Sequence, residues 1–271
     1  MILLLLFCIA IAFLIAVLFY RQRRAELSIL QIEQEKLDSQ LSELLEERQP
    51  LVIRGIQPPK GLTRDTLFKT PRLQNFPVGG QPLGLLLQDP SMLASSQGLP
   101  TLTYEGRIEL AKELSLPIWA EQGWRSRFAE TTWIGAAVGC TRTEVVIGGL
   151  GMMRTTANYT CIIPTDGENT VSLLSQQSEP FLPATWQYRY PNSLTVNDTA
   201  FVADLKYLDI VLRPGSALCI PTHMIVSMEP ANPTAFASLV ILEYHEPISL
   251  LTKMMSVGAI AFGSSTEEGS N

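Results

Sequence analysis

Histidine is scarce in this chain of 271 residues: His223 and His245 are the only two, and neither begins an H-x-D or H-x-E pair. Histidine is the commonest metal ligand and a frequent general base. The G-x-S-x-G and G-x-x-x-x-G-K-[ST] motifs of serine hydrolases and P-loop NTPases are also absent. Glu243 and His245 would share one face of a strand, since side chains alternate along it, but such a pair is more typical of hydrogen bonding than of a metal site. We therefore expect no metal, no cofactor and no catalytic residue.

Basic residues are too few for a nucleic-acid-binding surface. Lys and Arg number 20 against 26 Asp and Glu, which gives a net charge of −6. The one basic cluster is Arg21, Arg23 and Arg24, so no nucleic-acid partner is expected. The four cysteines form no C-x-x-C pair, which favours free thiols in a reducing compartment; they are Cys8, Cys140, Cys161 and Cys219.

Charge, proline, glycine and amide side chains are all missing from Ile2 to Tyr20. As a helix this run covers roughly 28 Å, close to the thickness of a hydrocarbon core. Its Leu, Ile, Phe and Val side chains favour a membrane by roughly 4 to 8 kcal/mol. A cleaved signal peptide would have a basic start and a small-x-small site after the run, and the run has neither. Residues 1–24 are thus predicted to be a single-pass anchor whose partner is the lipid bilayer.

The side of the membrane is predicted from Arg21, Arg23 and Arg24, which directly follow the apolar run. Positive charge stays on the cytoplasmic side, so the rest of the chain is expected in the cytosol. The sequons at Asn158 and Asn197 would be glycosylated only in the opposite topology.

Residues 25–49 are rich in strong helix formers and contain no glycine, and the only proline nearby is Pro50. This composition predicts a helical stalk. Heptad positions a and d point to a short coiled coil and a homo-oligomer, with Leu27, Leu30, Gln34, Leu37, Leu41 and Leu44 at the interface. The alternative is a helix that lays its leucines on its own domain.

Residues 50–253 are long enough for one domain with a core, and 254–271 are expected to be a tail. Prolines exclude long elements from 57 to 100, and one helix is expected at 104–114. The second half consists of short β-branched or aromatic runs separated by turn residues, which predicts a mainly β sandwich or barrel; the runs begin at residues 144, 158, 170, 209, 217, 224 and 237. Trp119, Trp124 and Trp133 around Phe128 are expected to cover one end of the barrel, rather than to form a recognition surface.

Four short segments occur in the order seen in cupin-like, JmjC-type domains. They are Pro50-Leu-Val-Ile-Arg-Gly55, the hairpin made of Ile147-Gly-Gly149 and Asn158 to Gly167, Phe181-Leu-Pro183, and Leu212-Arg-Pro-Gly-Ser-Ala-Leu-Cys-Ile-Pro221. The chain resembles this family from about residue 50 to 244. The resemblance implies a double-stranded β-helix, a jelly-roll barrel with a few flanking helices. It also implies iron(II) and 2-oxoglutarate oxygenase ancestry, with two His and one carboxylate as metal ligands.

The sequence departs from the family at every ligand position. The resemblance puts Met152 and Arg154 at the His-x-Asp pair, Val226 at the distal His, and Asn169 at the cosubstrate-binding Lys. A guanidinium has no lone pair to give, and a thioether is a poor iron(II) ligand. The expected function is therefore a membrane-anchored, non-catalytic binding or structural module, and the similarity of this layout to membrane proteins of large DNA viruses suggests a viral membrane. The alternatives are an oxygenase with a non-standard site and a purely structural oligomeric scaffold.

Overall fold

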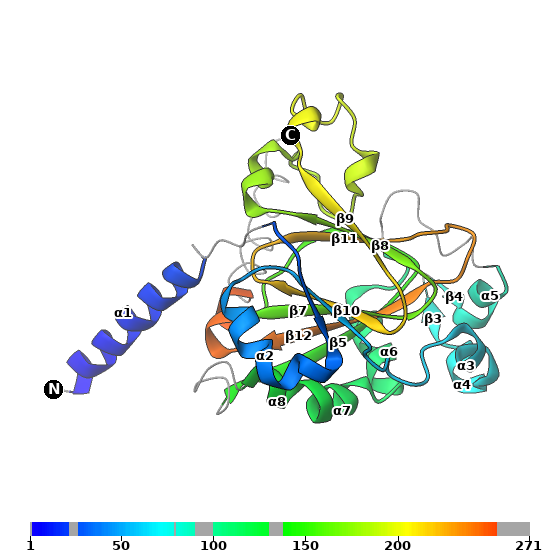
Figure 1. Ribbon diagram of the computed structural model, residues 1–271, viewed down its shortest axis with the longest axis horizontal. Helices are drawn as coiled ribbons and strands as arrows, with labels where there is room; N and C mark the ends of the chain where they lie inside the picture. The colour runs from blue at the N-terminus through cyan, green and yellow to red at the C-terminus, as the bar shows by residue number, and fades with distance from the viewer. Residues whose placement is uncertain (1, 22–26, 79, 90–99, 130–137, 254–271) are drawn as a thin grey trace, which may run out of the picture.

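The structure is a computed structural model that describes residues 2–21, 27–78, 80–89, 100–129 and 138–253 (Figure 1). The chain starts with helix α1 (Ile2–Arg21), whose side chains are described from residue 5 to residue 19. Among the described residues, no helix combines the length and the hydrophobicity needed to cross a membrane. Arg23, Arg24 and the predicted tail lie outside the described residues.

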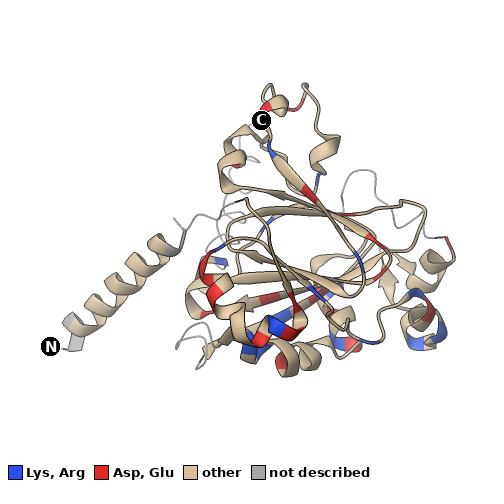
Figure 2. Ribbon diagram, viewed as in Figure 1, with Lys and Arg blue, Asp and Glu red and all other residues tan. Residues whose placement is uncertain are grey.

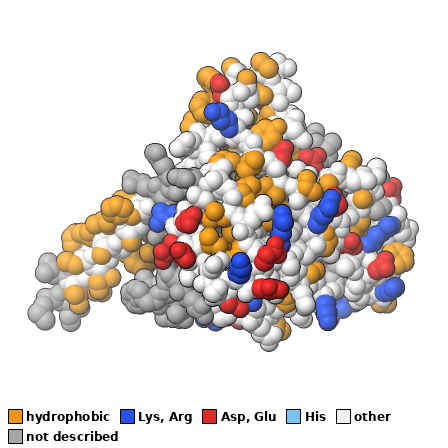
Figure 3. Space-filling view, viewed as in Figure 1, with side chains coloured by type: hydrophobic (Ala, Val, Ile, Leu, Met, Phe, Trp, Pro, Cys, Tyr) orange, Lys and Arg blue, Asp and Glu red, His pale blue; other side chains and the backbone are white. Residues whose placement is uncertain are grey.

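The described side chains of α1 are apolar and mostly exposed. Figure 2 shows no charged residue between positions 5 and 19, and Figure 3 shows hydrophobic side chains along this stretch. Phe7 and Phe19, for example, are 62% and 69% exposed. Nothing in the described part of the chain covers most of this surface.

Six strands form the larger of two main sheets, in the order β1-β2-β10-β7-β12-β5. β1 pairs with β2 in parallel, and the other neighbouring strands pair antiparallel. The strands are β1 (Leu30–Glu33), β2 (Leu51–Arg54), β5 (Cys140–Ile147), β7 (Tyr159–Asp166), β10 (Ser216–Pro221) and β12 (Ser238–His245).

Four antiparallel strands form the second sheet, in the order β6-β11-β8-β9. They are β6 (Leu150–Arg154), β8 (Asn169–Leu174), β9 (Tyr207–Leu212) and β11 (Ile225–Pro230), and a small hairpin joins β3 (Pro77–Val78) to β4 (Gln81–Pro82). Gly167 and Gly215 take positive φ angles of 69° and 95° in the β7–β8 and β9–β10 turns, a conformation that glycine adopts without steric cost. The predicted mainly β fold is confirmed, and a strand is present at each of the seven expected runs.

The two sheets face each other across an apolar core. Val146, Ile162, Leu173, Leu218 and Ile241 belong to this core. The alternate residues of the six-stranded sheet, such as Val145 and Cys219, pack on its outer face instead. This alternation follows from the two-residue period of a strand.

Helices cover the outer face of the six-stranded sheet, and Figure 1 shows α2, α7 and α8 together on that side. The predicted helix at 104–114 is confirmed as α6, which packs on β5. Trp124 and Phe128 are buried as predicted, with ring centroids 5.8 Å apart, but they pack on the outer face of the six-stranded sheet and not at one end of the fold. Trp119 is partly buried against the same cluster, while Trp133 lies outside the described residues. The helices are α2 (Gln34–Glu46), α3 (Arg64–Lys69), α4 (Pro71–Gln74), α5 (Leu83–Gln88), α6 (Tyr104–Glu113), α7 (Leu116–Ala120), the π-helical turn η2 (Glu121–Arg125) and α8 (Ser126–Ala129).

A segment between β8 and β9 packs on the outer face of the four-stranded sheet. Trp186 and Leu194 from this segment contact Leu174 of β8 and Ile225 of β11. It contains the 3₁₀ turns η3 (Gln176–Phe181), η4 (Pro191–Ser193) and η5 (Val202–Asp204). Figure 1 shows this segment on the opposite side of the molecule from α2.

The predicted stalk is wrong as a continuous helix. Residues 30–33 form β1, which pairs with β2, and α2 is the crossover that joins these two parallel strands. Leu37 and Leu41 are 0% and 3% exposed and pack in the core of their own domain. Leu27, Leu30, Gln34 and Leu44 are half-buried. The leucine stripe therefore serves the domain itself, the alternative left open above, and is not available as a coiled-coil interface.

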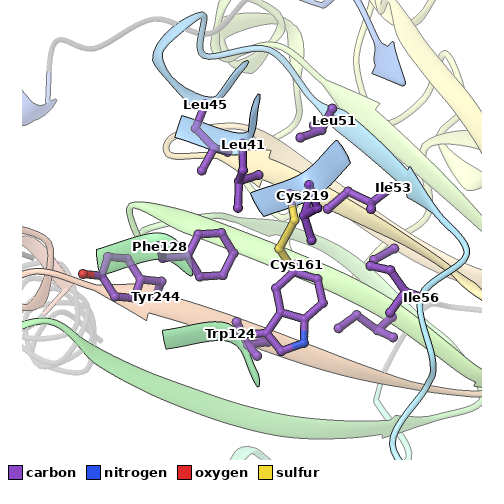
Figure 4. Close-up of a cluster of buried hydrophobic side chains, with 14 of the residues drawn as sticks. Leu41, Leu45, Leu51, Ile53, Ile56, Trp124, Phe128, Cys161, Cys219 and Tyr244 are labelled. Carbon is purple, nitrogen blue, oxygen red and sulfur yellow. A yellow bond between two sulfur atoms is a disulfide. The ribbon is translucent and has the colours of Figure 1, made fainter. Parts of the chain in front are cut away.

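The prediction of four free cysteines is also wrong. Cys161 of β7 and Cys219 of β10 lie directly opposite each other in the strand register and form a disulfide. Figure 4 shows this bond beneath Leu41 and Leu45, in the apolar layer between α2 and the sheet. Cys8 and Cys140 are free and exposed. The cysteines thus no longer favour a reducing compartment.

Candidate functional site

The positions predicted to replace the metal ligands do not come together. Val226 belongs to the core between the sheets, whereas Met152 packs on the outer face, with Trp186 and Leu194. The half-buried Arg154 forms an ion pair with Glu179. The structure therefore does not place these three side chains around one common point.

A β-bulge explains where Met152 points. Val226 pairs with Met153 and Met228 pairs with Leu150, so β6 has one extra residue between these pairs. The backbone of Met152 bonds instead with Tyr188 and Arg189 of the outer segment. Between the two sheets, the residues that pair with Val226 are therefore Met153 and, from β8, Leu173.

Asn169 lies near the other end of the four-stranded sheet from Val226. It pairs with Pro230 at the start of β8, while Val226 pairs with Leu173. Four residues of strand separate the two rows, or roughly 13 Å. The side chain of Asn169 is 0% exposed and its amide has no hydrogen-bond partner among the described residues. The predicted cosubstrate position is thus remote from Val226.

Charged side chains gather between the two sheets, at the end where β5 begins and β12 ends. Glu144 of β5 is two residues from Val146, and Glu243 and His245 of β12 are two and four residues from Ile241. All three side chains are therefore on the inner face, with these core residues. All three are buried. His245 Nε2 lies 3.1 Å from Glu243 Oε2, which confirms that these two residues share a face.

Three cations surround the ring of Tyr104, the first residue of α6. The charged groups of Arg142, Arg107 and Lys253 lie 4.5, 5.5 and 6.0 Å from its centroid. Such distances are typical of cation–π contacts. α6, β5, β12 and the helix at 247–253 each contribute to the group, which we call the mouth cluster: Tyr104, Arg107, Arg142, Glu144, Glu243, His245 and Lys253.

The two carboxylates of the mouth cluster differ in their partners. Lys253 Nζ donates to Glu243 Oε2 at 2.6 Å. Glu144 lies 3.6 Å from both Arg107 Nη2 and Arg142 Nε, which is longer than a hydrogen bond. Glu243 therefore has close donors, whereas Glu144 has two distant ones.

The pKa values of these two groups shift in opposite directions. Burial raises the pKa of Glu144, and the nearby Glu243 carboxylate raises it further. Burial also opposes ionisation of Glu243, but hydrogen bonds from His245 and Lys253 and their charge outweigh it and lower its pKa to about 2. Burial raises the pKa of Tyr104 as well. The surroundings thus favour the ionised form of Glu243 and disfavour ionisation of Glu144.

No family model and no curated protein matches the sequence of this chain. Among solved structures, protein NMB1881 from Neisseria meningitidis is similar over 38% of this chain and 72% of its own length, with 14% identity and a TM-score of 0.23. A likeness this weak carries no argument about fold or function.

Only part of the mouth cluster can be seen in the sequence. The Glu243–His245 pair was visible as an i, i+2 pair in a predicted strand. Glu144 lies next to the apolar residues of a predicted strand, a position that could have indicated a buried carboxylate. Nothing in the sequence relates Arg107 or Lys253 to Glu144, because these residues come together only through packing of α6 and the 247–253 helix.

Proposed function

We propose that this chain is a single-pass membrane protein whose β domain is a cupin-like double-stranded β-helix that acts as a non-catalytic binding or structural module. The observation that carries this proposal is the apolar row of Met153, Val226 and Leu173 inside the barrel. The resemblance would put the distal His in this row, at Val226.

The strand order supports the barrel. β5, β7, β10 and β12 belong to the larger sheet, and β6, β8, β9 and β11 belong to the smaller one. From β5 to β12 the chain therefore changes sheet at every step except from β8 to β9. Eight antiparallel strands arranged this way in two facing sheets are typical of a jelly roll. The apolar layer between the sheets is the interior that such a barrel requires.

The side chains of α1 support membrane attachment. A water-exposed helix usually has a polar face, whereas α1 has none between residues 5 and 19. Exposed apolar patches of this kind mark membrane or protein contacts. The apolar run and the Arg residues after it favour insertion with the domain on the cytosolic side.

The disulfide argues for the opposite side, because disulfides are rare in the cytosol. It is fully buried between α2 and the sheet, so soluble reductants have no direct access to its sulfur atoms. We therefore keep the cytosolic placement, which depends on the Arg flank. Attachment to a viral membrane stays a prediction.

The proposal is tested on the full chain in detergent micelles. After incubation with iron(II) or zinc and dialysis, elemental analysis should find no stoichiometric metal, and 2-oxoglutarate should not be turned over. Stoichiometric metal, or turnover above a heat-denatured control, would contradict the proposal. If metal is retained and is lost in Glu243→Gln, the Glu243–His245 pair forms a non-standard site and the enzyme alternative is favoured.

A further inference from the structure

We infer that the mouth cluster binds a small oxyanion, a carboxylate or a phosphate, through Arg107 and Arg142. This inference rests on the proposed function and deepens it, because it gives the binding module a ligand class. The anion would lie beside the ring of Tyr104, since both guanidinium groups are within 5.5 Å of the centroid of that ring.

The charges of the cluster do not balance. Lys253 is matched by Glu243, with which it forms a 2.6 Å hydrogen bond. Among the described residues, Glu144 is the one carboxylate that pairs with Arg107 and Arg142, at 3.6 Å from each. Two guanidinium groups thus share one carboxylate, and one positive charge is left over. Protonation of Glu144, which its environment favours, would increase this surplus.

Arg107 is the group that most needs a further partner. It is 4% exposed, and its Nε and Nη1 atoms have no hydrogen-bond partner among the described residues. A buried charge is stable only when it is paired and hydrogen-bonded. The free N–H groups of a guanidinium form a fork that matches the two oxygens of a carboxylate or phosphate.

Arg142 makes the cluster reachable from solvent. Its side chain is 32% exposed while that of Glu144 beside it is 3% exposed. Its guanidinium carbon lies 4.5 Å from the centroid of the Tyr104 ring, a distance typical of a cation–π contact. An anion arriving from solvent would first meet Arg142 and then the buried Arg107.

The competing explanation is a purely structural network, in which water satisfies Arg107 and the charges only fasten α6 and the 247–253 helix to the barrel. The two explanations differ in their response to added anions. A structural network gives no saturable binding. An anion site gives binding that saturates and that competes with salt.

The test is isothermal titration of inorganic phosphate and of citrate into the full chain in detergent micelles, with ionic strength held constant by sodium chloride. Saturable binding is expected for at least one probe. Arg142→Gln should weaken it at least about tenfold, since hydrogen bonds to charged groups are among the strongest in proteins. The matched control is Arg213→Gln, because Arg213 is 71% exposed and pairs with Glu168 away from the cluster; it should bind as the parent does.

No saturable binding of either probe, or equal binding by Arg142→Gln and the parent, would overturn the inference. Arg107→Gln is a second variant, expected to abolish binding; if it does not fold, the Arg142→Gln comparison still decides. The proposed function fails separately, on the metal analysis described above, so a metal-free chain that binds no anion sinks only this inference.

Discussion

The disulfide between Cys161 and Cys219 should make a large contribution to the stability of the domain. The two cysteines are 58 residues apart in sequence. Closing a loop of that length removes about 4 kcal/mol of conformational entropy from the unfolded chain in the chain-entropy estimate. Cys161→Ala/Cys219→Ala should therefore lower the free energy of unfolding by about 4 kcal/mol, and lost packing beneath Leu41 and Leu45 would add to this value.

The assay is urea denaturation of the full chain in detergent micelles, monitored by tryptophan fluorescence. Trp124 contributes to this signal and belongs to the same buried cluster as the disulfide. The double variant and the parent treated with reductant under unfolding conditions should have similar, lower midpoints. Cys140→Ala removes an exposed free thiol and should leave the midpoint unchanged. A double variant within about 1 kcal/mol of the parent, against the 2–5 kcal/mol usual for a native disulfide, would refute the reasoning, as would mass spectrometry showing two free thiols in the untreated chain.

Three further predictions concern the fold, the charges and the topology. Leu41→Ala should destabilise the domain by about 2–5 kcal/mol, because it opens a cavity in the core, while Glu43→Ala on the exposed face of α2 should have little effect on stability. Equal urea midpoints for these two variants would contradict the packing of α2 on its own domain and favour the predicted free stalk helix. The pKa of Glu243 is lowered from 4.5 to about 2 in the folded state, so its ionisation contributes stability above pH 4.5 that is lost as pH falls toward 2. In thermal melts at several pH values, Lys253→Met should reduce this loss of stability in acid, whereas the control Lys206→Met should not. Identical pH profiles for Lys253→Met and the parent would contradict the Lys253–Glu243 pairing. With the domain in the cytosol, the exposed Asn197 should carry no glycan after translation with microsomes, and a glycosidase-sensitive mass shift that Asn197→Gln abolishes would place the domain in the lumen.

Local patterns predicted the regular elements well. Short β-branched runs bounded by turn residues predicted seven of the strands, and the proline-free stretch at 104–114 predicted α6. These patterns are sufficient because strand alternation and helix spacing are properties of neighbouring residues. The heptad pattern of 25–49 failed because an amphipathic helix on its own domain has nearly the same leucine spacing as a coiled coil.

Long-range pairing could not be predicted. The disulfide depends on the register between β7 and β10, which places Cys161 opposite Cys219. The position of Met152 depends on a bulge in β6, since one extra residue reverses the faces of a strand. The mouth cluster brings Arg107, Glu144 and Lys253 together from three distant parts of the chain, and no spacing in the sequence encodes that meeting.

Membrane attachment is tested most directly by flotation with liposomes and extraction at alkaline pH. The full chain should float with liposomes and stay in the membrane pellet. Phe7→Arg/Ile11→Arg/Leu14→Arg should release it to the supernatant, since three arginines at the centre of a span cost roughly 8–10 kcal/mol, more than the roughly 4–8 kcal/mol that its apolar side chains contribute. Extraction of the parent chain, or equal flotation of the parent and the triple variant, would contradict the account.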